Sequence, residues 1–300
     1  MWYTFNVPTE PNILEPNPRA YFHGGTLVLE DVSRAAQPPR CFEWVKGKWR
    51  CPAVYYRLVQ PWLAGQGIKN GVPRWSKLSA VLADGRVPHP YQTEALRAWQ
   101  AAEQWGSVVL PTGAGKTFVA LHAIAACGVS TLVVVPTVDL LHQWYARLDN
   151  AFGGPVGVWY GQEKRLEPLT VTTYPSAWAN AEMFGDKFKL LIFDEIHHLP
   201  APSWHEIALM CAAPFRLGLT ATYPEKRPAE RKAAPQPGLF DDSPAADPAR
   251  LLAELVGPVV YRKQIDELTG EQLAEYRTER IRIDLTPDER ARYDAAYGIY

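Results

Sequence analysis

The sequence predicts an α/β protein in which a small α+β domain precedes a doubly wound parallel sheet. Two observations predict the sheet. Between residues 86 and 222, short continuous apolar runs alternate with helical stretches, and a glycine-rich loop joins one of these runs to the helix after it. Continuous apolar strands are typical of a parallel sheet that helices cover on both faces. The α+β domain is predicted from residues 1–85, which are rich in Pro, Trp and Gly and contain short strand-like runs.

The composition is that of an ordinary globular protein. The chain has 300 residues, 47% of them apolar and 21% charged, and its net charge is −1. This length suits about two domains. No apolar run reaches the roughly 20 residues of a membrane span, and the N-terminus does not resemble a signal peptide. We therefore expect a cytoplasmic protein with no membrane partner. Buried, reduced thiols are expected, because no paired spacing connects the four cysteines, Cys41, Cys51, Cys127 and Cys211.

In the N-terminal region, the apolar pattern predicts a strand at 26–29 and a helix at 52–63. Pro52 suits the first position of a helix, where the N–H that proline lacks is not needed. The apolar face of this helix is expected to hold Tyr55, Leu58, Val59 and Trp62.

In the central region, continuous apolar runs predict six strands. They lie at 107–110, 131–135, 156–159, 169–173, 190–193 and 215–219. A helix is predicted at 118–126, directly after the glycine-rich loop. Strands that alternate with helices in this way predict a doubly wound α/β domain.

The C-terminal region begins with a stretch at 223–248 that has six prolines and mixed charge, which predicts a disordered loop. A helix at 249–255, a strand at 259–262 and an alternating strand at 279–285 are predicted after it. Thr286-Pro287-Asp288-Glu289 forms a capping box, so a helix is expected to begin there. We therefore divide the chain into predicted domains at 1–85, 86–260 and 261–300, and expect the last to be the truncated start of a further domain.

A phosphate-binding loop is predicted between the strand at 107–110 and the helix at 118–126. Glycines let backbone N–H groups approach phosphate oxygens, and the helix N-terminus adds its positive end. A lysine at this position can reach the β- and γ-phosphates, and a following threonine can ligate Mg²⁺. The general pattern has a further Gly where this chain has Leu110, so a glycine-rich turn before an ordinary helix is the alternative. The nucleotide-binding candidates are Thr112, Gly113, Ala114, Gly115, Lys116 and Thr117.

A second part of the site is predicted at the end of the strand at 190–193. This buried strand delivers Asp194 and Glu195 at its carboxyl end, where α/β sheets bind ligands. Asp194 would hold Mg²⁺ together with Thr117, and Glu195 would orient and deprotonate the attacking water. A solvated acidic pair at a strand end is the alternative. The catalytic candidates are therefore Lys116, Asp194 and Glu195.

Five short motifs occur in a fixed order along the chain: Pro90-Tyr91-Gln92, Val135-Pro136-Thr137, Val171-Thr172-Thr173-Tyr174, Asp194-Glu195-Ile196-His197 and Leu219-Thr220-Ala221-Thr222. In order and spacing they resemble the superfamily 2 helicases, most closely those of the XPB type, including archaeal and bacterial members. The resemblance covers 86–222 most strongly, then 250–300, then 1–85. It implies a RecA-like P-loop fold, with ATP and Mg²⁺ as cofactors and DNA as partner.

The resemblance also implies roles for individual residues. Gln92 would read the adenine edge. His197 would connect the hydrolysis site to the segment that couples hydrolysis to movement. The coupling segment is Thr220, Ala221 and Thr222. The residues that would lie along the nucleic-acid backbone are Pro136, Thr137, Thr172 and Thr173.

The chain departs from the XPB pattern at two places. His89 stands where the family often has Arg, and Tyr223-Pro224-Glu225 follows where XPB proteins usually have an Arg-Glu-Asp element. The motifs of a second motor domain, including its arginine fingers, do not occur in the sequence. A second motor domain C-terminal to this chain is therefore an expected partner. Without it, we expect slow hydrolysis of ATP, because an arginine finger contributes about 10³–10⁵ in rate.

A basic, aromatic-rich stretch lies in the N-terminal region. Nine basic residues and one acid fall between Arg34 and Lys77, with aromatic residues interleaved. Basic groups that neutralise phosphates beside rings that stack on bases are typical of single-strand contact. The alternative is a small domain whose rings form its own core under a solvated basic face. The surface candidates for DNA contact are Trp44, Lys46, Lys48, Trp49 and Arg50.

The function predicted from these features is that of an ATP-dependent DNA helicase or translocase. It would act on single-stranded or forked DNA, in repair or transcription. One alternative is the motor subunit of a restriction system, which would have a nuclease partner. Another is a nucleic-acid-binding ATPase that switches without translocating, which loss of Lys116 or Glu195 would have favoured.

Overall fold

The computed structural model describes residues 14–72, 75–78, 81–224, 247–265, 267–268 and 285–297. The chain divides into two compact units, Met1–Gln264 and Ile265–Tyr300. Apart from their ends, the predicted loop at 223–248 and the predicted strand at 279–285 lie outside the described residues. Within these residues, no helix combines the length and apolar character needed to cross a membrane.

The N-terminal part of the first unit is a small, mainly antiparallel sheet with one helix, which confirms the predicted α+β class. Its strands are ordered β3-β4-β2-β1-β5, and β5 alone runs parallel to its neighbour. The elements are β1 (Leu14–His23), β2 (Thr26–Val32), β3 (Glu43–Val45), β4 (Lys48–Pro52), α1 (Tyr56–Gly65) and β5 (Lys69–Asn70).

The predicted helix at 52–63 exists, and its predicted apolar face is wrong only at Leu58, because Val59 is buried and Tyr55 and Trp62 pack against the core. It opens with a 3₁₀ turn, η1 (Ala53–Tyr55), before α1 begins at Tyr56. Leu58 is 71% exposed. Two adjacent apolar stripes that share Val59 run along this helix, and periodicity alone does not decide which one is buried more deeply. The buried stripe is Tyr56, Val59 and Leu63.

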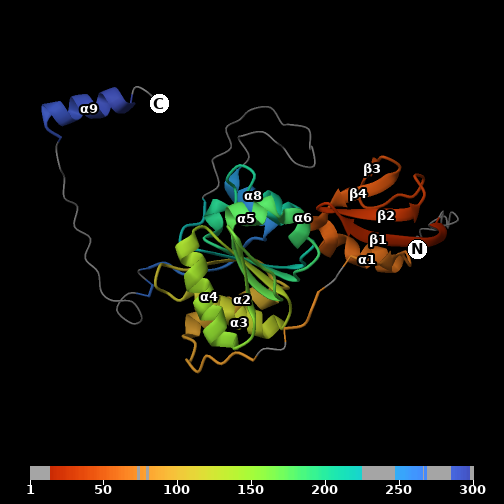
Figure 1. The fold of residues 1–300 in the computed structure, drawn as a ribbon, viewed down its shortest axis with the longest axis horizontal. Coiled ribbons are helices and arrows are strands. Elements are labelled where there is room, and N and C mark those ends of the chain that lie inside the picture. The colour runs from red at the N-terminus through yellow and green to blue at the C-terminus, as the bar shows by residue number, and fades with distance from the viewer. Residues whose placement is uncertain are drawn as a thin grey trace, which may run out of the picture. The chain divides into compact units, whose positions relative to one another are not determined.

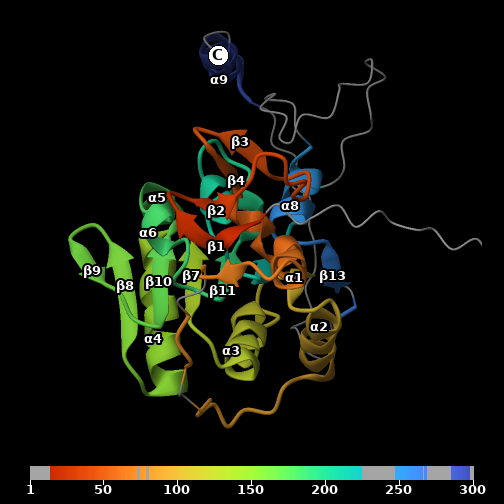
Figure 2. The ribbon, with the colours of Figure 1, turned by 90° about the vertical axis from the view of Figure 1, so that its right-hand side faces the viewer.

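The larger sheet confirms the predicted doubly wound parallel domain. Its order is β13-β6-β12-β11-β7-β10-β8-β9, and every described pair is parallel except β8 with β9. Figure 2 shows β8 and β9 at one edge of this sheet. Each of the six predicted central strands is present. The strands are β6 (Trp105–Val109), β7 (Thr131–Val135), β8 (Val156–Tyr160), β9 (Glu163–Arg165), β10 (Leu169–Thr173), β11 (Leu190–Asp194), β12 (Phe215–Thr220) and β13 (Val259–Arg262).

Helices cover both faces of the larger sheet. Figure 1 shows α2, α3 and α4 on one side of it and α5, α6 and α8 on the other. The predicted helices at 118–126 and 249–255 correspond to α3 and α8. The helices are α2 (Pro90–Ala101), α3 (Lys116–Cys127), α4 (Val138–Phe152), α5 (Tyr174–Ala179), α6 (Ala181–Phe184), α7 (Glu206–Leu209) and α8 (Pro248–Leu255), with a 3₁₀ turn η2 (Ile196–His198).

One charged side chain lies wholly inside this domain. Arg216, on β12, is 0% exposed, and its guanidinium stacks on the Trp105 ring at 4.9 Å. Burial lowers the pKa of Arg216 to about 10, so the group remains charged at neutral pH. The charge is stabilised by hydrogen bonds to the carbonyl oxygens of Ala213, Cys211 and Leu255, at 3.2, 2.7 and 2.6 Å. Arg216 therefore connects β12 to the end of α8 through its hydrogen bond to Leu255.

The second unit contains α9 (Pro287–Tyr297), which begins where the capping box predicts. The Thr286 hydroxyl donates to Glu289 Oε2 at 2.8 Å, and the Thr286 N–H donates to the same carboxylate at 2.9 Å.

The four cysteines are free thiols, but only two of them are buried. Cys51 and Cys211 lie in the core, whereas Cys41 and Cys127 are half-buried. The prediction of buried thiols is therefore wrong for Cys41 and Cys127.

Candidate active site

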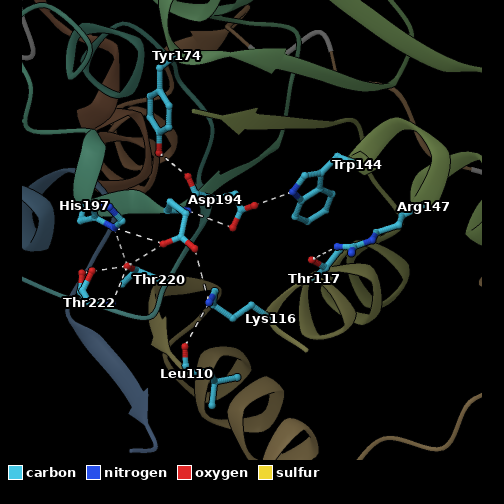
Figure 3. Close-up of polar contacts among 11 residues, drawn as sticks. Leu110, Lys116, Thr117, Trp144, Arg147, Tyr174, Asp194, His197, Thr220 and Thr222 are labelled. Atoms are coloured by element: carbon cyan, nitrogen blue, oxygen red, sulfur yellow. Dashed lines mark hydrogen bonds and ion pairs between the residues drawn. The ribbon is translucent and has the colours of Figure 1, made fainter. Parts of the chain in front are cut away.

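The candidate site lies at the carboxyl ends of three neighbouring strands, β6, β12 and β11. The glycine-rich loop follows β6, the acidic pair ends β11, and Thr220 ends β12. Parallel strands present their carboxyl ends at the same edge of a sheet, which is where α/β domains bind ligands. Residues far apart in the sequence therefore meet here, and Figure 3 shows Lys116, Asp194 and Thr220 at this edge, with the Asp194 carboxylate directed toward Trp144.

The glycine-rich loop has the backbone that its sequence predicts. Gly113 and Gly115 have φ angles of 84° and 78°, in the left-handed region that favours glycine. A side chain at Gly115 would also put its Cβ 2.4 Å from Gln92 Nε2. Gly115 is the N-cap of α3, and no described side chain caps this helix end. An uncapped helix N-terminus offers N–H groups and a partial positive charge to an anion.

Lys116 lies between the glycine-rich loop and the acidic pair. Its Nζ is 3.4 Å from the Leu110 carbonyl oxygen and 3.6 Å from Glu195 Oε1. The Lys116 side chain is only 10% exposed. Leu110 itself is fully buried in the core, so a side chain fits where the general pattern has glycine.

Asp194 is buried, and two donors bond its carboxylate while a third bonds its main-chain carbonyl oxygen. Its Oδ2 accepts a hydrogen bond of 2.7 Å from Trp144 Nε1, and its Oδ1 accepts one of 3.1 Å from the Glu195 N–H. The Tyr174 hydroxyl donates to the Asp194 carbonyl oxygen at 3.0 Å. Burial raises the pKa of the Asp194 carboxyl, and the Trp144 hydrogen bond opposes that effect.

Glu195 has an unusual backbone for a glutamate, with a φ of 47°. Non-glycine residues in this left-handed region are strained, and such strain often occurs at functional sites. The conformation directs the side chain toward three partners. Its carboxylate lies 3.6 Å from Lys116 Nζ, 3.4 Å from His197 Nδ1 and 3.3 Å from the Thr220 hydroxyl.

The predicted coupling residues form one hydrogen-bonded group. His197 Nδ1 is 2.9 Å from Thr220 Oγ1, which also accepts from the Thr222 N–H at 3.0 Å. Burial and the neighbouring His198 lower the pKa of His197, so its ring is neutral at pH 7. Ala221 lies between the two threonines and is half-buried. The acidic pair is thus joined to the end of β12 by hydrogen bonds.

Gln92 is buried against the glycine-rich loop. Its Nε2 donates to the Ala114 carbonyl oxygen at 3.0 Å, and its Oε1 accepts from the His89 N–H at 3.0 Å. Tyr91 donates to the same carbonyl at 2.8 Å. Both ends of the Gln92 amide are therefore engaged, and reading an adenine edge would require an exchange of these partners.

The contacts of two α4 side chains, Arg147 and Trp144, with the site were not predicted from the sequence. Arg147, an exposed residue of α4, donates from Nη1 to the Thr117 hydroxyl at 2.7 Å. Trp144 lies three residues earlier on the same helix, so the two side chains project from one face. Trp144 contacts Asp194, so each of these side chains touches one predicted Mg²⁺ ligand. The i, i+3 spacing was visible in the sequence, but the facing residues depend on the strand order.

The predicted DNA contacts in the larger domain have different exposures. Thr137 is exposed and caps α4, accepting from the Leu140 N–H at 3.3 Å, and Pro136 is half-buried. Thr173 is 6% exposed and caps α5. Thr172 is 0% exposed, and its hydroxyl donates to the Trp159 carbonyl oxygen at 2.7 Å. The Thr172 side chain is therefore closed to DNA in this structure, because neighbouring atoms cover it completely.

The predicted DNA contacts of the N-terminal sheet lie on the β3–β4 hairpin. Trp44 and Trp49 pack edge to face at 5.3 Å, and Lys46 is exposed at the turn. Lys48 Nζ donates to Glu30 Oε1 at 2.7 Å, so its charge is already paired. Arg50 donates to the Thr26 hydroxyl at 3.1 Å.

The residues present suit a magnesium nucleotide. Mg²⁺ takes oxygen ligands, and Thr117 and Asp194 supply a hydroxyl and a carboxylate. Lys116 and the uncapped end of α3 supply the positive charge that a polyphosphate requires.

Comparisons with known proteins agree with this arrangement. The profile of the family described as "Type III restriction enzyme, res subunit" matches residues 86–225. The "DNA 3'-5' translocase XPB2" of Sulfurisphaera tokodaii is 44% identical over 204 residues, covering 68% of this chain and 42% of that protein. The "DNA 3'-5' helicase XPB" of Mycobacterium tuberculosis is 29% identical over 203 residues, covering 64% of this chain and 33% of that protein.

Among solved structures, the UvsW helicase of bacteriophage T4 is 14% identical, with a TM-score of 0.46, and covers 82% of this chain and 99% of that chain. The two XPB relatives match this chain over less than half of their own length. Through the domain at 86–225, the chain belongs with the superfamily 2 helicases of the XPB type.

Proposed function

We propose that this chain binds and hydrolyses ATP as part of a DNA helicase or translocase of the XPB type. The observation that carries the proposal is the meeting of Lys116, Asp194 and Glu195 at one sheet edge, joined by hydrogen bonds to Thr220. The same group contains a cation, a metal ligand, a candidate base and a link toward a neighbouring strand end. A simple phosphate-binding module does not need the last two.

Each residue of the group has a defined task in this proposal. Lys116 leaves Glu195 and meets the β- and γ-phosphates, together with the N–H groups of the glycine-rich loop. Thr117 and Asp194 hold Mg²⁺, which neutralises charge on the phosphate oxygens when bound. Glu195, released from Lys116, orients and deprotonates water. His197 is neutral and passes any displacement of Glu195 to Thr220 through their shared contacts.

DNA is the proposed track because the relatives are named as DNA 3'-5' translocases and helicases. The same proposal includes a second motor domain and partners in repair or transcription. It also includes DNA contacts through Pro136, Thr137, Thr173 and the β3–β4 hairpin. The motor subunit of a restriction system is the second candidate, since the matching family profile carries that description. ATP-dependent cleavage of DNA by the natural protein would favour this second candidate, whereas movement without cleavage would favour the XPB type.

Nucleotide binding tests the site directly. Isothermal titration calorimetry of the 300-residue chain with Mg²⁺ and a non-hydrolysable ATP analogue should show binding. Lys116→Ala should weaken it by at least about tenfold, because a charge-assisted contact to phosphate is lost. Lys164→Ala, on the exposed strand β9, is the matched control and should bind as the wild type does. Equal affinity of Lys116→Ala and wild type would refute the phosphate site.

Hydrolysis tests the role of Glu195. Glu195→Gln keeps the shape of the side chain but removes the base, so it should retain nucleotide binding while hydrolysis by the natural full-length protein falls by about 10². The measurement is steady-state release of phosphate with single-stranded DNA present. A variant that turns over near the wild-type rate would exclude Glu195 as the base.

A further inference from the structure

Asp194 is held by aromatic residues from two different elements, one bonded to its carboxylate and the other to its main-chain carbonyl oxygen. The Trp144 indole, on α4, donates to Oδ2 at 2.7 Å, and the Tyr174 hydroxyl, at the start of α5, donates to the Asp194 carbonyl oxygen at 3.0 Å. Both rings are 0% exposed, and Asp194 itself is 7% exposed. Figure 3 shows the two rings approaching Asp194 from separate directions.

These contacts fix more than the packing of the core. A carboxylate has about four lone-pair positions. Trp144 and the Glu195 N–H occupy one on each oxygen, which sets the rotation of the carboxylate and leaves the remaining positions for a metal ion. The Tyr174 bond holds the main chain at the point where Glu195 takes its left-handed conformation.

The two aromatic residues also lie on helices whose N-caps, Thr137 and Thr173, belong to the segments predicted to face DNA. Trp144 is on the helix that begins after Pro136 and Thr137. Tyr174 directly follows Thr173 at the end of β10. A change at either segment therefore has a short, buried path to Asp194.

We propose that Trp144 and Tyr174 are positioning residues that orient Asp194 for Mg²⁺ and connect it to the two segments predicted to face DNA. The inference rests on the proposed function, because it requires that Asp194 hold Mg²⁺. Outer partners of metal ligands contribute about 10–100-fold to metal affinity. Neither aromatic residue touches nucleotide in this account, and both act through Asp194.

Calorimetry of the 300-residue chain with an ATP analogue, in Mg²⁺ and in EDTA, tests the positioning role. Trp144→Phe keeps an aromatic ring and removes the indole donor. Mg²⁺ should raise the affinity of this variant for the ATP analogue about tenfold less than it raises the wild-type affinity. The affinity in EDTA should stay at the wild-type value. Trp99→Phe is the matched control. Trp99 is equally buried, but its indole donates at 2.8 Å to the Arg216 carbonyl, outside the site.

Tyr174→Phe is a milder second variant. It removes only the hydroxyl, and the ring can still stack on Trp204, whose centroid lies 5.4 Å away. Because one hydrogen bond is removed, Mg²⁺ should raise the affinity of this variant for the ATP analogue about threefold less than it raises the wild-type affinity. A general folding defect would lower the affinity in EDTA as well, and would overturn the positioning role. Full Mg²⁺ gain in both variants would overturn it too, with the proposed function intact. Absence of any Mg²⁺ gain in the wild type would instead refute the proposed function itself.

A linkage measurement tests the connection to DNA. The affinity of the chain for a single-stranded oligonucleotide is measured with and without the Mg²⁺–nucleotide complex. Coupling between two sites is reciprocal, so a connection through Asp194 requires that this complex change the DNA affinity. The effect of the Mg²⁺–nucleotide complex on the DNA affinity should be at least about threefold smaller in Trp144→Phe than in the wild type. In Trp99→Phe this effect should keep its wild-type size. An unreduced change in Trp144→Phe, or no change in the wild type, would overturn the connection.

Discussion

At the residue scale, Arg147 places a positive charge beside a predicted metal ligand. Its guanidinium donates to the Thr117 hydroxyl at 2.7 Å. A cation at that position repels Mg²⁺, although solvent screens an exposed charge strongly. Arg147→Gln should therefore raise the Mg²⁺ affinity of the nucleotide-bound chain by about threefold. The measurement is a Mg²⁺ titration at saturating nucleotide, with Arg250→Gln, an exposed arginine on α8, as control. Weaker Mg²⁺ binding in Arg147→Gln would contradict this repulsion.

His122 gives a pH dependence outside the site. Burial lowers the pKa of this histidine, whose ring lies 4.4 Å from that of Phe118 on α3, and no described group pairs with its buried Nε2. Its pKa in the unfolded chain is about 6.5. Folding thus favours the neutral ring, and the resulting stability is complete above about pH 6.5 and is lost as the pH falls toward the folded pKa.

His122→Leu should remove this contribution. Urea unfolding at about pH 7.5 and about pH 5.5 should show a smaller loss of stability in the variant than in the wild type. His23→Leu, in which an exposed histidine of the N-terminal sheet changes, is the control and should follow the wild type. Parallel curves for His122→Leu and wild type would show that His122 does not titrate on unfolding.

The residues of the site differ in how far the sequence predicts them. Lys116, Asp194 and Glu195 belong to short motifs whose residue types are dictated by phosphate and metal chemistry, so each was predicted with its strand or loop. The hydrogen bond between Trp144 and Asp194 joins residues 50 positions apart. That contact depends on which strand lies next to which, and local patterns do not contain this information. The same reason applies to Arg147.

At the element scale, the β3–β4 hairpin carries the predicted DNA contacts, but part of its charge is already paired. Glu30, on β2, contacts both Lys48 and Arg19. These contacts lower the pKa of Glu30 and raise that of Lys48. Because its charge is paired with Glu30, Lys48 attracts DNA phosphates less strongly than an unpaired lysine would.

Glu30→Gln should release Lys48 and strengthen DNA binding by the hairpin. The log–log dependence of single-strand affinity on salt should steepen by about 0.7 for the one added phosphate contact. Glu254→Gln, which removes an equal charge from α8, should leave the slope unchanged. Titrations of a fluorescent oligonucleotide at several salt concentrations give both slopes. An unchanged slope in Glu30→Gln would favour the alternative in which the hairpin is a solvated basic face.

Elements with a continuous apolar pattern were predictable, and short polar ones were not. All six predicted central strands are present, because parallel strands buried on both faces are mostly apolar. The exposed strand β9, Glu163-Lys164-Arg165, has no such pattern and exists through its pairing with β8. The helix at 52–63 was predicted, and of its predicted apolar face only Leu58 is exposed, since two apolar stripes that share Val59 lie side by side there.

At the scale of the whole molecule, the order of the strands and the packing between the two sheets lie beyond local pattern. The sequence predicts a small domain at 1–85 and a boundary before 86. In the structure, Val54 of the N-terminal part belongs to a core cluster of the larger domain, and Ala212 of the larger domain belongs to the core cluster of the smaller sheet. Arg57 stacks over Trp105 at 5.3 Å and forms an ion pair with Glu103. The two sheets therefore share buried surface.

At Gly185 the two sheets pack so closely that a side chain does not fit. A Cβ at this position would lie 2.0 Å from Phe22 Cζ, on β1, and 2.6 Å from the Met210 carbonyl oxygen. The ring of Phe22 can turn away, but a backbone carbonyl cannot move without shifting the chain. Gly185→Ala should therefore separate the smaller sheet from the larger domain while each keeps its own core. Gly65→Ala is the matched control, because no atom lies within 4 Å of a Cβ at that position.

Scanning calorimetry distinguishes the two outcomes. Because the sheets share core residues, the wild type and Gly65→Ala should unfold Met1–Gln264 in one cooperative transition. In Gly185→Ala the smaller sheet should melt first, giving two transitions and earlier proteolytic cleavage between residues 72 and 90. Overpacking of this kind typically costs about 1–3 kcal/mol, so the lower transition should shift by several degrees. If Gly185→Ala melts in one transition at the wild-type temperature, the close contact at Gly185 is not what holds the smaller sheet to the larger domain.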